Sequence, residues 1–167
     1  MRQISADGVV GATSTSMVYT LDQSAPTISV TSDRNALKIG DTASLTFTFS
    51  ESVVDFDASD IAVSGGTLSN VAGSGKTYNA TFMPTAGSTT PGSVSVASGR
   101  FTDVAGNTNA DGSEPNNAVS FAIDTVAPSI AISSDKSRLL YGETATLTFI
   151  LSEAASDFTA SDLTCLL

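Results

Sequence analysis

The chain has 167 residues, of which 41% are hydrophobic and 7% aromatic, enough for the cores of small folded domains. Acidic residues outnumber basic ones by 17 to 7, and the resulting formal net charge of -10 argues against nucleic acid as a partner, because phosphate binding needs a basic surface. No apolar run approaches the roughly 18 residues of a membrane span, and with no histidine and no nucleophile motif we do not expect an enzyme.

Short segments in which apolar and polar residues alternate follow one another along the chain. In one of them Leu45, Phe47 and Phe49 alternate with Ser and Thr, the pattern of a strand with one buried face. About seven such segments with turn-forming residues between them predict an all-β fold, an immunoglobulin-like antiparallel β-sandwich. The predicted strands of the full unit are residues 27–31, 43–49, 60–63, 67–71, 77–83, 92–97 and 118–123.

A stretch of 40 residues is written twice. Residues 22–61 align with residues 124–163 without a gap at an offset of 102, and 20 of the 40 positions are identical. A period of that length indicates one whole domain per repeat, so the sandwiches are expected in tandem. We therefore predict a complete unit at 22–123 and the N-terminal part of a following, truncated unit at 124–167. Residues 1–21 are interpreted as the C-terminal end of a preceding unit.

The two incomplete units at the ends of the chain carry their own expectations. MVYTLDQSAP before the complete unit parallels VSFAIDTVAP before the next one, which is why residues 1–21 are assigned to a preceding unit. Residues 124–167 supply only two or three strands, so we expect that segment to be ill-ordered alone or to pair along an exposed edge. The single cysteine, Cys165, excludes a disulfide within the chain.

Three segments carry a resemblance to a known family. DTVAP at the start of a unit, TATLTFILSEAASDFTASDL with its Ser-Glu, and the closing FTDVAGNTNADG resemble the bacterial immunoglobulin-like repeats of large secreted and cell-surface adhesins. The resemblance implies an extracellular stalk repeat that projects a distal binding module for cell adhesion or biofilm attachment. It also implies neighbouring repeats of the same chain as partners, and calcium ions near the junctions that stiffen the stalk.

The positions of the acidic residues predict a calcium site without reference to any family. In a seven-strand sandwich whose termini lie at opposite poles, the loops after the second and sixth strands return to the pole where the unit begins, and these two loops are acidic. Carboxylates gathered there would repel one another, whereas Ca²⁺ accepts six to eight oxygen ligands in irregular geometry. The candidate metal ligands are Asp22, Glu51, Asp55, Asp60, Asp103, Asn107 and Asp111, with Asp124, Glu153 and Asp157 in the second copy.

Two alternatives to metal binding remain open for these acids: they could be solvated surface acids without a partner, or they could cap turns. The aspartates of DFDASD could cap turns through hydrogen bonds to the backbone, and Asp57 is replaced by Thr159 in the second copy. The segment from Asn107 to Gly112 has oxygen side chains at alternate positions followed by glycine, like the start of an EF-hand loop. The first ligand is Asn rather than Asp, and Ala118 stands at the twelfth place where a bidentate glutamate belongs, so an EF-hand is not expected. A metal-bound loop of another geometry and an uncharged turn both stay open.

The sequence leaves two other functions open. The unit itself could bind a glycan or a host protein through its loops, which an exposed loop aromatic would favour; Phe56 and Phe101 are the candidates. Alternatively, the chain could be a spacer within a large secreted hydrolase.

Overall fold

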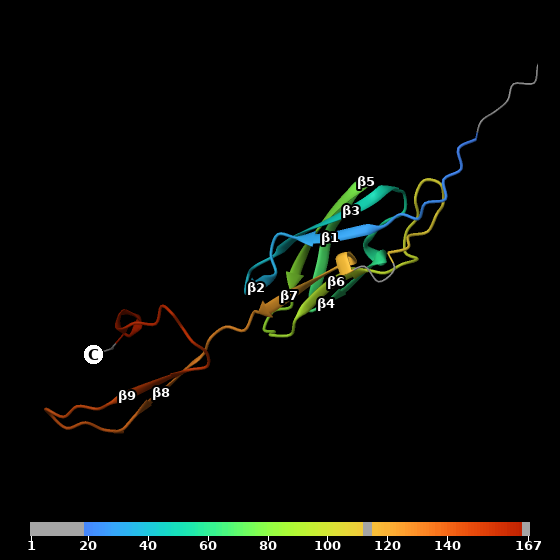
Figure 1. Ribbon diagram of the computed structural model, residues 1–167. Helices are drawn as coiled ribbons and strands as arrows, with labels where there is room; N and C mark the ends of the chain where they lie inside the picture. The colour runs from blue at the N-terminus through green and yellow to red at the C-terminus, as the bar shows by residue number, and fades with distance from the viewer. Residues whose placement is uncertain (1–18, 112–114, 165–167) are drawn as a thin grey trace, which may run out of the picture.

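A computed structural model describes residues 19–111 and 115–164 of the chain (Figure 1). The regular structure of these residues consists of strands and three short 3-10 turns, η1 (Ala58–Asp60), η2 (Pro115–Asn117) and η3 (Ala160–Asp162). The strands are β1 (Ile28–Ser32), β2 (Ala36–Lys38), β3 (Ala43–Val53), β4 (Ile61–Ser64), β5 (Gly66–Pro84), β6 (Gly92–Val96), β7 (Ala118–Asp124), β8 (Ile130–Ser134) and β9 (Leu147–Leu151).

The complete unit consists of two sheets packed face to face. One has the strand order β1-β3-β5 and the other β2-β7-β6-β4. All pairings are antiparallel except that of β2 with β7. The predicted all-β, immunoglobulin-like sandwich is confirmed.

The predicted alternation is seen directly in β3, where Leu45, Phe47 and Phe49 are buried. They face the buried side chains of β6 and β7 in the other sheet, so the two inner faces form one hydrophobic core. Phe82 and Phe121 stack within this core with their ring centroids 4.5 Å apart and their planes at 8°. The core residues of the unit all lie between Ile28 and Ile123.

Two features of the strand arrangement differ from the sequence prediction. The three-residue strand β2 is absent from the predicted strands, because three residues are too few to show a period; Leu37 is nevertheless buried beside Ile123 of β7. The predicted strands 67–71 and 77–83 belong to the single element β5, which folds back on itself. Within this element a side chain at Gly73 would collide with the carbonyl of Thr77, so the two arms approach too closely for any other residue.

The second copy repeats the local pairing of the first without its core. Ile130 of β8 lies opposite Leu151 of β9, as Ile28 of β1 lies opposite Phe49 of β3, at the same offset of 102 residues. Ile132 is 60% exposed, whereas the equivalent Val30 is 4% exposed. The repeated sequence therefore specifies the strand pairing, while burial needs the second sheet that residues 124–164 do not supply.

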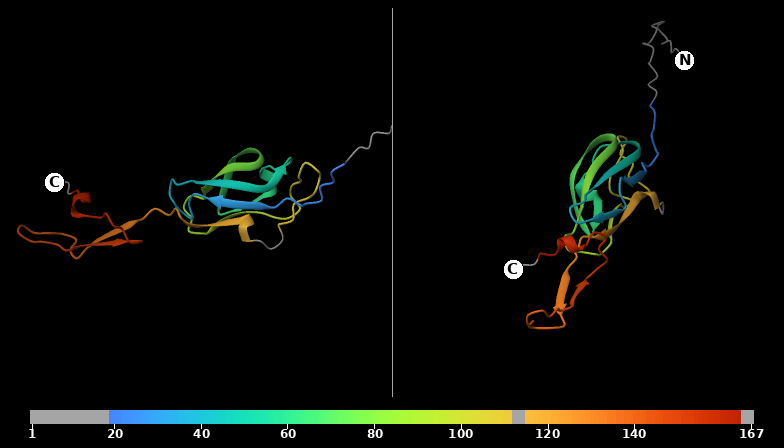
Figure 2. Two further views of the ribbon diagram at one scale, coloured as in Figure 1. Left: turned by 45° about the horizontal axis from the view of Figure 1, so that its top comes forward. Right: turned by 90° about the vertical axis from the view of Figure 1, so that its left-hand side faces the viewer.

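The chain enters and leaves the complete unit at opposite ends (Figures 1 and 2). We call the end with residue 22, loop 54–60 and loop 97–111 the N-terminal pole. The opposite end, with turn 39–42, loop 85–91 and residue 125, is the C-terminal pole. Successive units of an array would therefore meet pole to pole.

Candidate metal centre

Three carboxylates from distant parts of the sequence meet at the N-terminal pole. Oxygen atoms of Asp22, Glu51 and Asp103 all lie within 4.8 Å of one another. Asp22 belongs to the segment before β1, Glu51 lies near the end of β3, and Asp103 follows β6. The meeting of the two acidic loops with the segment that enters the unit is the arrangement that the topology predicted.

Backbone contacts hold the two loops side by side. Val53, at the end of β3, forms an isolated antiparallel bridge with Asp103, and the Val54 amide donates to the Thr102 carbonyl at 3.2 Å. Because Glu51 is two residues before Val53, this bridge fixes the Glu51 and Asp103 carboxylates on the same part of the surface. Asp103 is buried, Glu51 is partly exposed and Asp22 is exposed, so the cluster opens to solvent on the side of the entering chain.

Asn107 forms hydrogen bonds with two members of the cluster, Asp103 and Asp22. Its side-chain Nδ2 donates to Oδ2 of Asp103 at 2.7 Å and to the backbone carbonyl of Asp22 at 3.2 Å. Its backbone amide donates to the other carboxylate oxygen of Asp103 at 2.8 Å. Asn107 therefore orients the Asp103 carboxylate and attaches the segment before β1 to loop 97–111.

The pKa values of two members shift in opposite directions. Burial, followed by the nearby charges of Asp22 and Asp103, raises the pKa of Glu51, although Lys76 opposes this. Burial also pushes the pKa of Asp103 upward, but hydrogen bonds from the Asn107 side chain and from the backbone amides of 105–107 outweigh it and lower that pKa. The folded protein thus keeps Asp103 ionised and makes the charge on Glu51 unfavourable in the absence of a cation.

This pair of shifts predicts how stability depends on pH in a chelator. The raised pKa of Glu51 means that its folded carboxyl takes up a proton before the unfolded one, so its unfavourable contribution fades as pH falls toward 4.5. The lowered pKa of Asp103 means that its contribution is present above 3.8 and is lost as pH falls further. Urea unfolding between about pH 3 and about pH 7 measures this dependence. In the parent protein the destabilising contribution of Glu51 should fade as pH falls, whereas Glu51→Gln should lack this change. Identical pH profiles of the unfolding free energy in the parent and in Glu51→Gln would contradict an unfavourable charge on Glu51.

The other candidate ligands of the complete unit have partners within the protein. Oδ1 of Asp55 accepts from the Thr102 amide at 2.7 Å. Asp57 and Asp60 form a reciprocal capping box around η1, and the hydrogen bonds from the side chain and backbone of Ser59 lower the pKa of Asp57. For Asp57 and Asp60 the structure thus contains the turn-capping contacts that were the alternative to metal binding.

Asn109 and Asp111 have a structural role that the sequence did not reveal. Both are buried; Asp111 accepts a hydrogen bond from the Ile28 amide of β1 and another, at 2.7 Å, from Nδ2 of Asn109. Asn109 in turn accepts from the amides of Arg100 and Phe101. Asn109 and Asp111, two of the alternate polar residues that suggested the start of an EF-hand loop, instead fasten loop 97–111 to the first strand. Gly112 of that pattern lies outside the described residues.

The second copy contains the equivalents of two members of the cluster. Oδ1 of Asp124 accepts from the Val126 amide at 3.3 Å, as Oδ1 of Asp22 accepts from the Ser24 amide at 3.0 Å. Glu153 and Asp157 are exposed. The position equivalent to Asp103 would be 205, which the 167-residue sequence does not include, and the metal-binding prediction for these three residues stays a prediction.

The fold and this acidic pole define the class of protein: a β-sandwich unit of a tandem array, with an acidic cluster that could hold a metal ion. The family model of the bacterial Ig-like domain matches residues 22–120 and again residues 124–166, and the chain belongs to this family. The family inferred from the sequence is thereby confirmed. No curated protein and no solved structure matches the chain. In residues 19–111 and 115–164, no helix is long and apolar enough to cross a bilayer.

Proposed function

We propose that this chain is a section of the stalk of a bacterial surface adhesin, in which tandem Ig-like units project a distal binding module and calcium rigidifies the junctions. Two successive family matches support the tandem array. The opposite poles of the complete unit support an extended arrangement, because the chain leaves this unit at the end opposite to the one at which it enters (Figure 2). An extracellular location agrees with the usual occurrence of this family on surface and secreted proteins.

The observation that carries the proposal is the position of Asp22. It belongs to the segment that joins units, yet its carboxylate lies within 4.8 Å of carboxylates from β3 and from loop 97–111 of the unit that follows it. Oxygen ligands of this kind suit Ca²⁺. When bound, calcium would supply the positive charge that offsets the repulsion among Asp22, Glu51 and Asp103.

The residues of the chain explain why such a joint would respond to calcium. Without a cation, repulsion from Glu51 and Asp103 pushes Asp22 and its segment away from the pole, while the Asn107 side chain holds the Asp22 carbonyl with a single hydrogen bond of 3.2 Å. With a cation bound, two contacts would hold the segment: the Asp22 carboxylate would bind the cation, and the Asp22 carbonyl would keep its hydrogen bond from Asn107. Outside the cell, where calcium is plentiful, the stalk would be stiff; in the calcium-poor cytosol it would be looser and easier to export.

The loops of the complete unit give less support to direct binding of a glycan. Phe56 and Phe101, the loop aromatics that could have stacked on a sugar, are buried at 5% and 1% exposure. They pack edge to face with each other and with Phe49 in the core. Neither ring is free to form a binding platform.

Thermal unfolding of the full chain tests the proposal. In millimolar calcium we expect the melting temperature to rise by on the order of 10 °C over that in excess chelator, because a ligand that binds only the folded state stabilises it by mass action. Magnesium, which prefers a tighter octahedral site, should give little of this rise. Equal melting temperatures in calcium and chelator would refute a calcium-stiffened stalk.

A further inference from the structure

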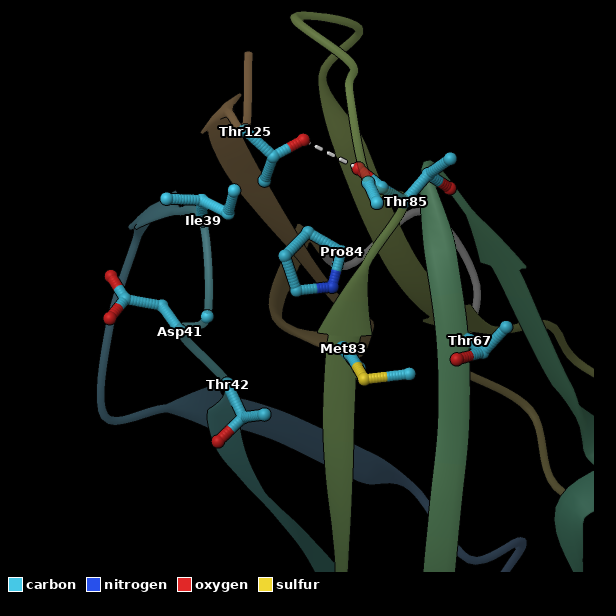
Figure 3. Close-up of a pocket in the computed structure, with 10 residues that line it drawn as sticks. Ile39, Asp41, Thr42, Thr67, Met83, Pro84, Thr85 and Thr125 are labelled. Carbon is cyan, nitrogen blue, oxygen red and sulfur yellow. Dashed lines mark hydrogen bonds between the residues drawn. The ribbon is translucent and has the colours of Figure 1, made fainter. Parts of the chain in front are cut away.

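The C-terminal pole of the complete unit carries a largely apolar pocket of about 370 Å³. It lies between the turn at Ile39 and the end of β5 at Met83 and Pro84, with Thr125 of the linker at its edge (Figure 3). The side chains of Ile39 and Met83 are 62% and 55% exposed. Two large apolar side chains beside one cavity form a surface that an apolar partner could cover.

The linker leaves this pocket from a fixed point. Oγ1 of Thr125 donates to the Thr85 carbonyl at 2.6 Å (Figure 3). It also accepts from the Ser88 amide at 2.9 Å. The backbone of Thr125 adds hydrogen bonds with the Ser88 carbonyl at 2.9 Å and the Gly87 amide at 3.2 Å. The following unit therefore begins at a defined place beside the pocket.

The N-terminal pole carries an apolar projection. Residues 103–106 form a tight turn in which the Gly106 amide donates to the Asp103 carbonyl at 3.3 Å. Val104, at the tip of this turn, is 75% exposed. Covering the Val104 side chain with an apolar partner would be favourable, because it removes apolar surface from water.

The repeat brings these two features together. Asp124 is the equivalent of Asp22 at the offset of 102 residues, and Asp22 lies within 4.8 Å of Asp103, the residue before Val104. Asp124 in turn immediately precedes Thr125 at the edge of the pocket. A following unit that gathers its acids around Asp124, as the complete unit does around Asp22, thus brings its own Val104 turn to the pocket of the unit before it.

We propose that the Ile39–Met83 pocket of one unit receives the Val104 turn of the next unit in the array, so that each junction has an apolar contact beside its acidic cluster. This inference rests on the proposed stalk, because it needs units joined pole to pole. The contact would restrict rotation of one unit against the next, which hydrogen bonds along a single linker do not do.

A two-unit protein tests the contact: residues 22–127 joined to residues 26–127, so that both units keep the native linker. Each unit contains its own complete core. Because the only cysteine of the chain is Cys165, Thr48→Cys in each unit gives two unique spin-label sites on an exposed strand face. The distribution of distances between the labels reports how freely the units move. It is measured in millimolar calcium and in excess chelator.

The matched controls come from the symmetry of the design. Val104→Ser in the second unit, or Met83→Ser in the first, alters the junction; the same substitutions in the opposite units alter free poles and have the same composition. Burial of one valine side chain favours the docked state by about tenfold. We therefore expect the junction variants, and not their controls, to broaden the distance distribution. Equal widths for junction and control variants would overturn the docking contact.

The two proposals fail in distinguishable ways. If calcium raises the melting temperature but junction and control variants have equal widths, the calcium-stiffened stalk stands and the docking contact is wrong. If calcium has no effect but the junction variants alone broaden the distribution in chelator, the docking contact stands and the calcium site is wrong.

Discussion

Glu51→Gln is expected to remove most of the calcium-dependent rise in melting temperature while leaving the calcium-free protein as stable as the parent or more stable. The substitution keeps the shape of the side chain and removes its charge. In calcium it deletes a carboxylate ligand of the cluster. In chelator it removes a charge that burial and the carboxylates of Asp22 and Asp103 make unfavourable, as the raised pKa of Glu51 shows. The two effects therefore have opposite signs.

Glu143→Gln is the matched control for this experiment. Glu143 is a surface glutamate of the second copy, 3.9 Å from Lys136, and its substitution changes the net charge by the same amount. Thermal unfolding of parent and both variants in calcium and in chelator separates local from global charge effects. A calcium response that Glu51→Gln leaves intact, or that Glu143→Gln removes equally, would contradict a site built on Glu51.

Phe82→Ala is expected to destabilise the complete unit by about 3–5 kcal/mol, the usual effect of removing a large buried aromatic side chain. Phe82 is fully buried, stacks on Phe121 at 4.5 Å and lies between the two sheets. Its removal opens a cavity that rigid strands cannot close, and this is a large part of the 5–15 kcal/mol that a domain typically has. Urea unfolding in chelator, with the change in midpoint at constant slope, measures the loss.

Phe158→Ala in the second copy provides the comparison. Phe158 is 38% exposed and contacts only the Phe149 ring, at a centroid distance of 5.7 Å, among the aromatic pairs of the described residues. Its removal should change the main unfolding transition by less than about 0.5 kcal/mol, as for other surface substitutions. Similar losses for both variants would show that residues 124–164 share the core of the complete unit.

The strands with one buried face could be predicted from the sequence because their side chains alternate between core and solvent. Leu45, Phe47 and Phe49 have this pattern, and all three are buried. The pattern could not find β2, whose three residues gain their place from parallel pairing with β7, a contact with residues more than 80 positions away. The alternation of side chains also could not show that β5 is one element that folds back on itself. That depends on the close approach of its two arms at Gly73, which is a contact in space.

The acidic pole could be predicted in outline but not in detail. Chain topology was enough to bring Asp22, Glu51 and Asp103 together. It could not separate them from Asp111, which has the same side chain in the same loop but points inward to the amide of Ile28. That difference depends on the path of loop 97–111 over β1, which no local pattern records.

The proposed calcium site would fix the segment before β1 to the N-terminal pole. Hydrogen–deuterium exchange of the backbone amides of residues 22–25 in the full chain tests it most directly, in calcium and in chelator. We expect exchange to slow by about tenfold or more in calcium and to return to the chelator rate in Glu51→Gln. Equal exchange in calcium and chelator would show that the linker is not held by the cluster and would contradict a calcium-stiffened junction.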